Sequence, residues 1–428
     1  MNILLLGSGG REHAFAWKIK QSTLCSALFI APGNAVTATL GTNIDISVLD
    51  FDAIKTFCEA EKINMVIAGP EDPLVAGIYD YFKNDEELQN ILVIGPSKQA
   101  AQLEGSKAFS KKFMKRHGIP TASYQAFEAD TFAEGEKYLA THTLPIVLKA
   151  DGLAAGKGVV ICESNEEAVN VFTSMIKDRQ FGEAGSRVVV EQFLKGIEVS
   201  IFVMTDGVDY KVIGHAKDYK RIGEGDTGPN TGGMGCVSPV PFADELFMKK
   251  VVERIIKPTI DGLCKEQLVY KGFVFFGLIK VDDEPYLIEY NCRMGDPETE
   301  VVLPRLKNDL VALCKCLYDG NLHEQTIVFD SRSCSTVVAV SSGYPGDYKT
   351  GFEIAGLEQN AQSSSDTIIF HSGTKASDDK ILTNGGRVLA VTSFGNTIGE
   401  AVGKSLLTLK NISFKGMTYR KDIGYEFI

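Results

Sequence analysis

Short apolar runs separated by loops of small residues dominate the first hundred positions. Four such runs, each followed by a loop that begins with or contains glycine, lie at residues 3–6, 28–30, 65–68 and 91–94. Helix-like stretches at residues 12–21 and 52–61 lie between them. Strand-length runs that alternate with helices predict βαβ units and a parallel sheet. The ligand crevice of such a sheet lies beyond the carboxyl ends of its strands, where these loops would meet.

The first of these loops, Gly7-Ser8-Gly9-Gly10, has the composition of a phosphate cradle. Its glycines let backbone N–H groups approach an anion at a helix start, and Arg11 follows immediately. A dinucleotide site would require a third glycine where this chain has Glu12. An NAD-dependent oxidoreductase is therefore a weaker interpretation than a sugar-phosphate site or a structural turn.

A different pattern appears in residues 288–300, where Glu289, Asn291 and Arg293 lie at alternate positions of an apparent strand. Alternate strand residues share a face. On that face Glu289 and Asn291 offer the oxygen ligands that Mg²⁺ prefers, and Arg293 can reach phosphate oxygens. The pattern predicts ATP handling. The alternative is an amphipathic edge strand with solvated polar residues.

Residues 148–159 resemble a Walker A loop but have the wrong glycine spacing, and Gly158 stands where Ser or Thr is needed. Strand-like runs at 145–149 and 159–162 flank the glycines, so the segment is predicted to be a hairpin. A glycine hairpin that carries Lys149 and Lys157 suits a lid over triphosphate. A plain surface hairpin is the alternative.

A buried strand is predicted at residues 188–194, followed by a polar turn and Glu198. Backbone groups at such a strand end can read the adenine edge, and the Glu198 carboxylate can accept hydrogen bonds from ribose hydroxyls.

Composition limits the class of protein. The chain has 428 residues, so about three domains are expected. The 44% hydrophobic and 23% charged residues are typical of a soluble globular protein. The net charge is −11 and the chain has no Lys/Arg run, so we expect no nucleic-acid partner. The first residues predict neither a signal peptide nor a membrane span.

Nine cysteines are scattered without a CxxC pair, which predicts free thiols and a cytoplasmic location. Cys314 and Cys316 are the most closely spaced, and we expect them to be two helix residues. A zinc or disulfide role for them is the alternative.

Seven motifs in order resemble the glycinamide ribonucleotide synthetase family of the ATP-grasp superfamily. They are GSGGREH at 7–13, GPE at 69–71, GPS at 95–97, LEGSK at 103–107, DYKR at 218–221, NTGGMG at 230–235 and NCRMGDPET at 291–299. The resemblance spans nearly the whole chain. It implies an α/β fold with an N-terminal parallel-sheet pre-ATP-grasp domain at 1–102, an ATP-grasp domain at 103–325 whose mobile lid runs from about 121 to 187, and a small mixed α+β C-terminal domain at 326–428.

The resemblance also implies an activity: ATP-dependent ligation of glycine to 5-phosphoribosylamine through glycyl phosphate, in purine biosynthesis. The implied small-molecule partners are glycine, 5-phosphoribosylamine and ATP, with Mg²⁺ or Mn²⁺ as the metal. No coiled-coil heptads are present, so a monomer is expected.

Site residues follow from the resemblance and the patterns above. The catalytic groups are Arg293, Lys149 and Lys107, and the metal ligands are Glu289 and Asn291. A salt bridge to Asp296 or Glu298 is the alternative role for Arg293. The ATP-binding residues are Lys107, Lys149, Gly156, Lys157, Gly158, Glu191, Gln192, Leu194 and Glu198.

For the other substrates, the implied residues are Gly9, Gly10, Arg11, Glu12, Asn34, Glu71, Asp72, Asp218, Arg221 and Asp296. Among them Asp218 is expected to hold the glycine ammonium and Arg221 its carboxylate, with surface charges that latch the lid as the alternative.

One departure from the wider superfamily concerns the strand at residues 276–280, which carries no carboxylate for an additional metal. Asp282, Asp283 and Glu284 are expected in an exposed turn after it.

Two further functions remain as alternatives besides the NAD-dependent oxidoreductase. One is an ATP-dependent carboxylase or synthetase that uses another amine. The other is a nucleotide sensor without activity, which would be expected to lack Lys149, Glu289 or Asn291; all three are present.

Overall fold

The computed structural model describes residues 1–153, 158–360 and 366–428. The predicted glycine hairpin residues Gly156 and Lys157 lie outside these ranges. Within the ranges, no helix is long and apolar enough to cross a membrane.

The N-terminal part is the predicted βαβ series. Strands β1, β2, β4 and β5 pair in parallel, and the glycine-rich loop separates β1 from α1. The elements are β1 Asn2–Gly7, α1 Gly10–Ile19, β2 Ala27–Pro32, β3 Thr42–Asn43, α2 Phe51–Ala60, β4 Met65–Ala68, α3 Glu71–Ala76, α4 Ile78–Lys83 and β5 Leu92–Pro96. The two-residue strand β3, which extends the parallel sheet beyond β2, is too short to be recognised from apolar runs.

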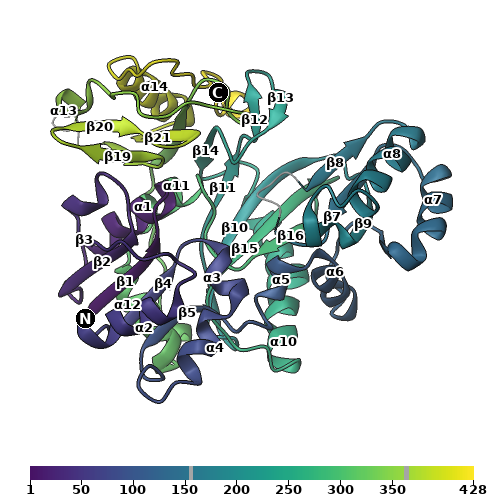
Figure 1. Ribbon diagram of the computed structural model, residues 1–428, viewed down its shortest axis with the longest axis horizontal. Coiled ribbons are helices and arrows are strands. Elements are labelled where there is room, and N and C mark those ends of the chain that lie inside the picture. The colour runs from purple at the N-terminus through teal and green to yellow at the C-terminus, as the bar shows by residue number, and fades with distance from the viewer. Residues whose placement is uncertain (154–157, 361–365) are drawn as a thin grey trace.

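A four-stranded antiparallel unit projects from the rest of the molecule (Figure 1). Its strand order is β6-β9-β7-β8, and α7 and α8 pack on it around an apolar cluster of its own. We call this unit the lid. Its elements, with the two helices that precede it, are α5 Gln102–Gly105, α6 Lys107–Arg116, β6 Tyr124–Glu128, α7 Phe132–Ala140, β7 Ile146–Ala150, β8 Val159–Cys162, α8 Asn165–Ile176 and β9 Arg187–Gln192.

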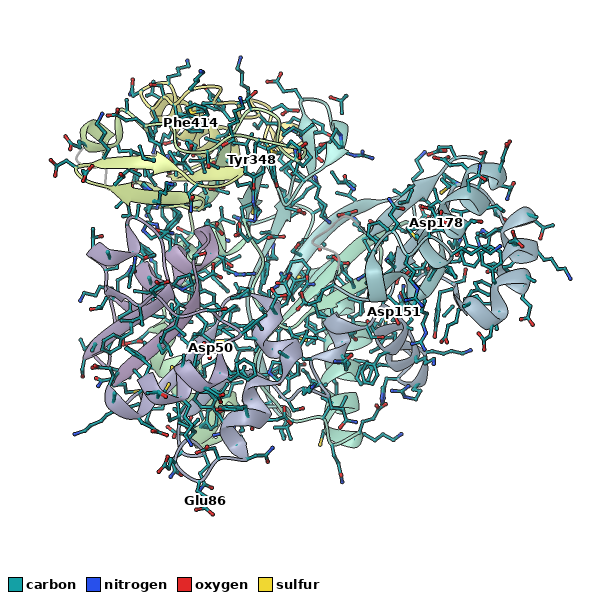
Figure 2. The ribbon with its side chains drawn as sticks, viewed as in Figure 1. Asp50, Glu86, Asp151, Asp178, Tyr348 and Phe414 are labelled. Carbon is teal, nitrogen blue, oxygen red and sulfur yellow. The ribbon has the colours of Figure 1, made fainter. Side chains whose placement is uncertain are left out.

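The predicted glycine hairpin is confirmed by the antiparallel pairing of β7 with β8, in which Lys149 lies opposite Val159. Asp151 ties the base of the lid to α6, because its carboxylate accepts hydrogen bonds from Ser106 Oγ and Ala108 N at 3.0 and 3.1 Å. Figure 2 shows Asp151 on the side of the lid toward the centre of the molecule and Asp178 farther out.

A central antiparallel sheet lies between the lid and the rest of the chain. Its strands are β10 Ile197–Thr205, β11 Tyr210–Asp218, β14 Gly235–Ser238, β15 Tyr270–Val281 and β16 Glu284–Asn291. A small hairpin, β12 Arg221–Gly223 with β13 Thr227–Asn230, follows β11. The helices of this part are α9 Glu245–Val251, α10 Lys257–Lys265, α11 Thr299–Arg305 and α12 Leu310–Asp319, and a π-helical turn, Val252–Ile256, joins α9 to α10.

Cys314 and Cys316 are buried free thiols on α12, as expected for helix residues. Asp282 and Asp283 form the exposed turn, but Glu284 does not belong to it. Glu284 begins β16 and is half-buried, because it pairs with Lys250 and Arg254.

The C-terminal part continues the same sheet. Its elements are β17 Ser333–Val340, α13 Leu357–Asn360, β18 Thr367–His371, β19 Thr374–Ser377, β20 Lys380–Thr383, β21 Arg387–Gly395 and α14 Ile398–Leu409. Thr397 caps α14 by accepting a hydrogen bond from Glu400 N. Strand β17 pairs with β14 and β15 pairs with β5, so one 13-stranded sheet passes through all three parts.

Candidate active site

A pocket of about 460 Å³ lies where the lid, the central sheet and the N-terminal loops meet. More than half of the residues predicted for ATP, metal and substrate line it. They are Arg11, Glu71, Asp72, Lys107, Lys149, Gly158, Glu191, Asp218, Glu289, Asn291, Arg293 and Asp296. These residues come from segments almost 300 positions apart, and the fold brings them together around one pocket.

Glu289 and Asn291 lie on β16 and both face this pocket. The amide nitrogen of Asn291 donates to Glu104 Oε1 at 2.9 Å, which directs its carbonyl oxygen elsewhere. In the described residues, the Glu289 carboxylate has neither a hydrogen bond nor an ion pair. Two oxygen ligands in the wall of this pocket fit Mg²⁺, which keeps several waters and binds through few protein groups. No cluster of three or more His, Cys, Asp or Glu side chains able to hold a metal occurs in the described ranges.

Arg293 does not form the salt bridge to Asp296 or Glu298 considered above. It instead lies between two other carboxylates, with Nε 3.1 Å from Glu71 and Nη2 2.9 Å from Glu104. Burial raises the pKa of Glu104, and Arg293 opposes that effect. For Glu71, the charges of Arg293 and Arg11 outweigh burial and lower its pKa. Arg293 is thus held rigidly with its guanidinium at the pocket wall.

Lys149 and Lys111 share one buried partner, Glu191. Their ammonium groups lie 3.1 and 2.9 Å from Glu191 Oε2. Burial alone would raise the pKa of Glu191, but the two lysines lower it. Burial lowers the pKa of Lys111 to about 8. Glu191, predicted to read adenine through its backbone, therefore also acts as the counter-ion of two lysines.

Lys107 reaches from the first turn of α6 to the lid, where its ammonium donates to the carbonyl of Gly152 at 2.9 Å. Ser106 caps this helix by accepting from Phe109 N. Because Lys107 and Lys111 are four residues apart, they lie on the same face of α6, and both line the pocket.

A second hollow of about 610 Å³ adjoins the first and shares Arg11, Pro70, Asp72 and Asp296 with it. Gly9 and Glu12 also line it. The carboxylate of Glu12 accepts hydrogen bonds from Gly9 N and Arg11 Nε, both at 2.6 Å. A Cβ at Gly7, where φ is +123°, would lie 2.5 Å from Glu12 Cγ. Glu12 therefore fills the loop where a third glycine of a dinucleotide site would leave space.

Several predicted residues do not line these two pockets. Asn34 is buried, and its amide nitrogen donates to the carbonyls of Ser8 and His371. Gln192 accepts from Ser123 Oγ at the edge of the lid. Arg221 donates to the carbonyl of Gly228 inside the β12–β13 hairpin. The others are Gly10, Leu194 and Glu198, of which Glu198 contacts the pocket residue Lys220 at 2.8 Å.

Five charged residues that line the pocket were not among the predicted site residues. Glu104 and Lys220 lie inside motifs already noted, and Lys111 follows Lys107 by one helical turn. The approach of Arg387 to Asp296, at 3.1 Å from β21, has no signal in the sequence. The fifth, Glu298, is buried, and burial together with Asp218 raises its pKa to about 7.

The pocket therefore combines paired lysines, a fixed arginine and two oxygen ligands beneath a lid, an arrangement able to bind a triphosphate and stabilise phosphoryl transfer. A family model described as "Phosphoribosylglycinamide synthetase, ATP-grasp (A) domain" matches residues 105–299, which places the chain in the ATP-grasp class. Models of the N and C domains of the same synthetase match residues 1–104 and 334–426. The chain belongs to the phosphoribosylglycinamide synthetase family.

Curated relatives support this assignment over the full length. The chain is 46% identical over 432 residues to phosphoribosylamine–glycine ligase of Salmonella typhimurium, covering 100% of this chain and 99% of the relative. The corresponding ligase of Haemophilus influenzae is 45% identical over 434 residues, with coverage of 100% and 99%. The predicted α/β fold with N-terminal, ATP-grasp and C-terminal parts is thereby confirmed.

Solved structures agree. Phosphoribosylamine–glycine ligase from Thermotoga maritima superposes with a TM-score of 0.84 at 34% identity and covers 99% of this chain and 100% of its own. Biotin carboxylase from Campylobacter jejuni has a TM-score of 0.74 at 15% identity, covering 99% and 94%, which shows a shared fold alone.

Proposed function

We propose that this chain joins glycine to 5-phosphoribosylamine at the expense of ATP, giving glycinamide ribonucleotide, ADP and phosphate in purine biosynthesis. The observation that carries the proposal is the face of β16, where Glu289 and Asn291 open into a pocket that Arg293, Lys107 and Lys149 surround. The full-length similarity to phosphoribosylamine–glycine ligases supports the choice of substrates.

The ATP-binding part of the proposal places the triphosphate beside Lys107, Lys149 and Arg293. Glu289 and Asn291 would hold Mg²⁺ or Mn²⁺, which when bound neutralises charge on phosphate oxygens. The biotin carboxylase domain from Hydrogenobacter thermophilus, which shares the fold at 16% identity, was solved with MgADP. The lid closes the pocket from one side and excludes water.

In the first step, a carboxylate oxygen of glycine attacks the γ-phosphorus. A new P–O bond forms, the bond to the β-phosphate oxygen breaks, and ADP leaves. The approach of one anion to another requires nearby positive charge, which the fixed guanidinium of Arg293 and the lysines supply. Asp218 holds the glycine ammonium.

In the second step, the amine of phosphoribosylamine attacks the carbonyl carbon of glycyl phosphate. The C–O bond to phosphate breaks and the amide forms. The nitrogen releases one proton, and Glu298 is the carboxylate that we assign to accept it, because it lines the pocket and its pKa is about 7. The sugar phosphate lies along the loop from Gly9 to Glu12, near Asp72.

We also propose domains at 1–102, 103–325 and 326–428 and a monomeric state. The lid, expected at about 121–187, extends to Gln192 because β9 belongs to its sheet. All nine cysteines are free, which supports a reducing, cytoplasmic environment.

The test is ATP-dependent phosphate release with freshly generated phosphoribosylamine, comparing glycine, alanine and bicarbonate as acids. Release that requires glycine and is abolished in Glu289→Ala supports both the substrates and the metal ligands. Release driven by bicarbonate, or the absence of release with every acid, would overturn the substrate assignment and leave the fold unaffected.

A further inference from the structure

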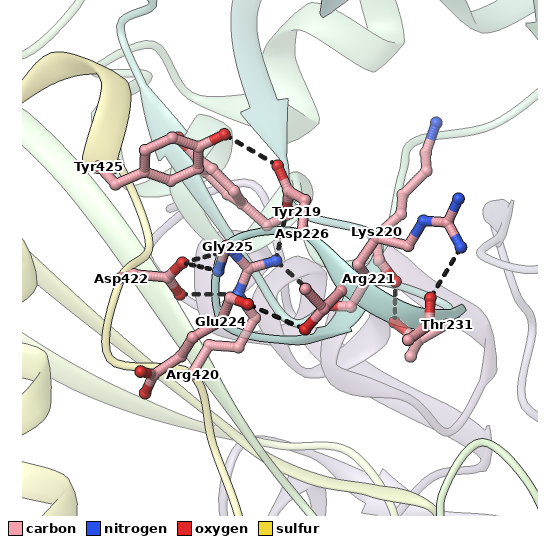
Figure 3. A network of polar contacts seen from close by, with 12 residues as sticks. Tyr219, Lys220, Arg221, Glu224, Gly225, Asp226, Thr231, Arg420, Asp422 and Tyr425 are labelled. Atoms are coloured by element: carbon pink, nitrogen blue, oxygen red, sulfur yellow. Dashed lines mark hydrogen bonds and ion pairs between the residues drawn. The ribbon is translucent and has the colours of Figure 1, made fainter.

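Residues near the C-terminus form hydrogen bonds and ion pairs with the β12–β13 hairpin (Figure 3). The buried guanidinium of Arg420 donates to Asp226 Oδ1 at 2.7 Å and to the carbonyl of Arg221 at 3.1 Å, so it bonds both to the hairpin turn and to the start of β12. Its Nε and Nη2 atoms donate to the two carboxylate oxygens of Asp422, both at 2.8 Å. Asp422 in turn accepts from Gly225 N at 2.7 Å.

Two more residues of the same segment complete the contact. Tyr425 donates its hydroxyl to Asp226 Oδ2 at 3.0 Å. Glu426 accepts from the hydroxyl of Tyr219 at 2.5 Å and lies 2.9 Å from Lys217 Nζ. We call Arg420, Asp422, Tyr425 and Glu426 the C-terminal clamp.

The hairpin is joined to the active-site pocket at both of its ends. Asp218 and Lys220 precede it, Thr231 and Gly232 follow it, and all four line the pocket. Thr231 closes the base, because its backbone N–H and its hydroxyl both donate to the Lys220 carbonyl, at 2.7 and 2.8 Å. Turn residues 224–226 are exposed apart from the contacts to the clamp.

We propose that the C-terminal clamp is a positioning device for glycine: it sets the hairpin so that Asp218, Lys220 and Thr231 stand in the pocket wall, with Arg420 as the central positioning residue. The clamp touches neither pocket itself, so its effect passes through the hairpin. This inference rests on the proposed function for the identity of the substrate.

The sugar-phosphate wall provides an internal comparison. Gly9, Glu12 and Asp72 line the second hollow, and the clamp contacts none of them. A displaced hairpin should therefore weaken the use of glycine and leave the use of phosphoribosylamine unchanged. General loss of folding would affect both.

The experiment is steady-state kinetics of Arg420→Gln with each substrate varied in turn. We expect the KM for glycine to rise about tenfold, with less than about a twofold change in the KM for phosphoribosylamine and in kcat. The matched control is Arg332→Gln, because Arg332 also joins two aspartates, Asp330 and Asp366, at 2.9 and 2.7 Å, but lies away from the hairpin. It should leave all three constants unchanged.

A milder variant guards against misfolding of Arg420→Gln. Asp226 has φ of 54°, a conformation that asparagine tolerates, so Asp226→Asn keeps the turn and removes the charge that faces Arg420. We expect the KM for glycine to rise about threefold, again without change for phosphoribosylamine.

Hydrogen exchange gives a readout independent of activity. The Gly225 amide should exchange faster in Arg420→Gln than in the wild type or Arg332→Gln. Unchanged exchange, or an equal rise in the KM of both substrates, would overturn the clamp. A wild-type chain without glycine-dependent release would overturn the proposed function, and the exchange of Gly225 would then still decide whether the clamp holds the hairpin.

Discussion

Glu298 and Glu300 are two positions apart and both buried, yet their surroundings give them different chemistry. Glu298 lines the active-site pocket and accepts a hydrogen bond from Ser200 Oγ at 3.3 Å. Glu300 lies against Gly10, and within the described part of the chain neither of its carboxylate oxygens has a hydrogen-bond partner. Burial and the charge of Asp296 raise its pKa well above the usual value. A buried carboxyl without a partner is favoured in its neutral form.

Replacement of Glu298 tests the proton acceptor. In Glu298→Gln we expect kcat to fall by about 100-fold or more, because the amide cannot take the proton of the attacking amine. The first step needs no such acceptor, so trapping glycyl phosphate with hydroxylamine should still give glycine hydroxamate at a near wild-type rate. Equal loss of both activities would contradict the assignment. In the wild type, kcat should rise with pH through about 7 as Glu298 loses its proton.

Glu300→Gln tests the neutral carboxyl. A group whose pKa is raised on folding lowers stability as pH rises above its unfolded pKa, and glutamine has the same shape without the charge. The free energy of unfolding of the variant should therefore exceed that of the wild type by about 1 kcal/mol or more at pH 8. This difference should shrink toward pH 5. Thermal unfolding at both pH values measures this. If the stability of the variant relative to the wild type were lower at pH 8 than at pH 5, this prediction would be wrong.

At the scale of elements, the lid meets α6 through a small set of polar contacts. Asp151 binds the first turn of α6, and Lys107 returns from that turn to the Gly152 carbonyl. The lid has an apolar cluster of its own, so its core does not depend on packing against α6. Lys111 and Lys149, from α6 and β7, meet at Glu191 on β9 and hold the two sides together.

Asp151→Asn should weaken the junction between the lid and α6. The amide retains an acceptor for Ala108 N but loses the charge that also faces Arg187 at 3.2 Å. We expect the KM for ATP to rise about threefold to tenfold while the melting temperature changes little, because the apolar clusters remain intact. Asp178→Asn, farther out on the lid, serves as the control. A large fall in melting temperature with unchanged KM would instead indicate a structural role.

Elements with strong patterning were predictable from the sequence. The four parallel strands and the β7–β8 hairpin appear where apolar runs and glycines predicted them. Glu289, Asn291 and Arg293 were visible as one polar group because alternate strand positions share a face. Arg387 was not, because its approach to Asp296 depends on how β21 packs across the molecule. Glu284 was misplaced because its partners Lys250 and Arg254 lie on and next to α9, far away in sequence.

At the scale of the whole molecule, the N-terminal and C-terminal parts meet at two buried histidines. His13 Nδ1 accepts a hydrogen bond from His371 N at 2.8 Å. Burial lowers the pKa of His13 to about 4 and that of His371 to about 3. Both rings are therefore neutral in the folded protein at neutral pH, and a protonated His13 could not accept this bond.

Acid should thus destabilise the protein through this contact. The folded pKa values lie below the unfolded value of about 6.5, so stability is full above that pH and falls as pH drops toward the folded values. Each histidine should lower the free energy of unfolding by about 2 kcal/mol between pH 7 and pH 5. Denaturant unfolding of His13→Asn, which keeps an acceptor but cannot titrate in this range, should show a flatter pH dependence. The exposed His323→Gln should behave like the wild type.

The 13-stranded sheet that passes through all three parts has a consequence for how the chain can be cut. Separating the parts between β14 and β17 would break a pairing of four residues on each strand, and separating them between β5 and β15 would break one of two. Both cuts would leave backbone N–H and C=O groups without partners. Unpaired strand edges of this kind pair with strands of other molecules. We therefore expect fragments that correspond to single domains to aggregate when expressed alone and to recover solubility when the complementary fragment is co-expressed, so that two separate genes could in principle encode one working assembly.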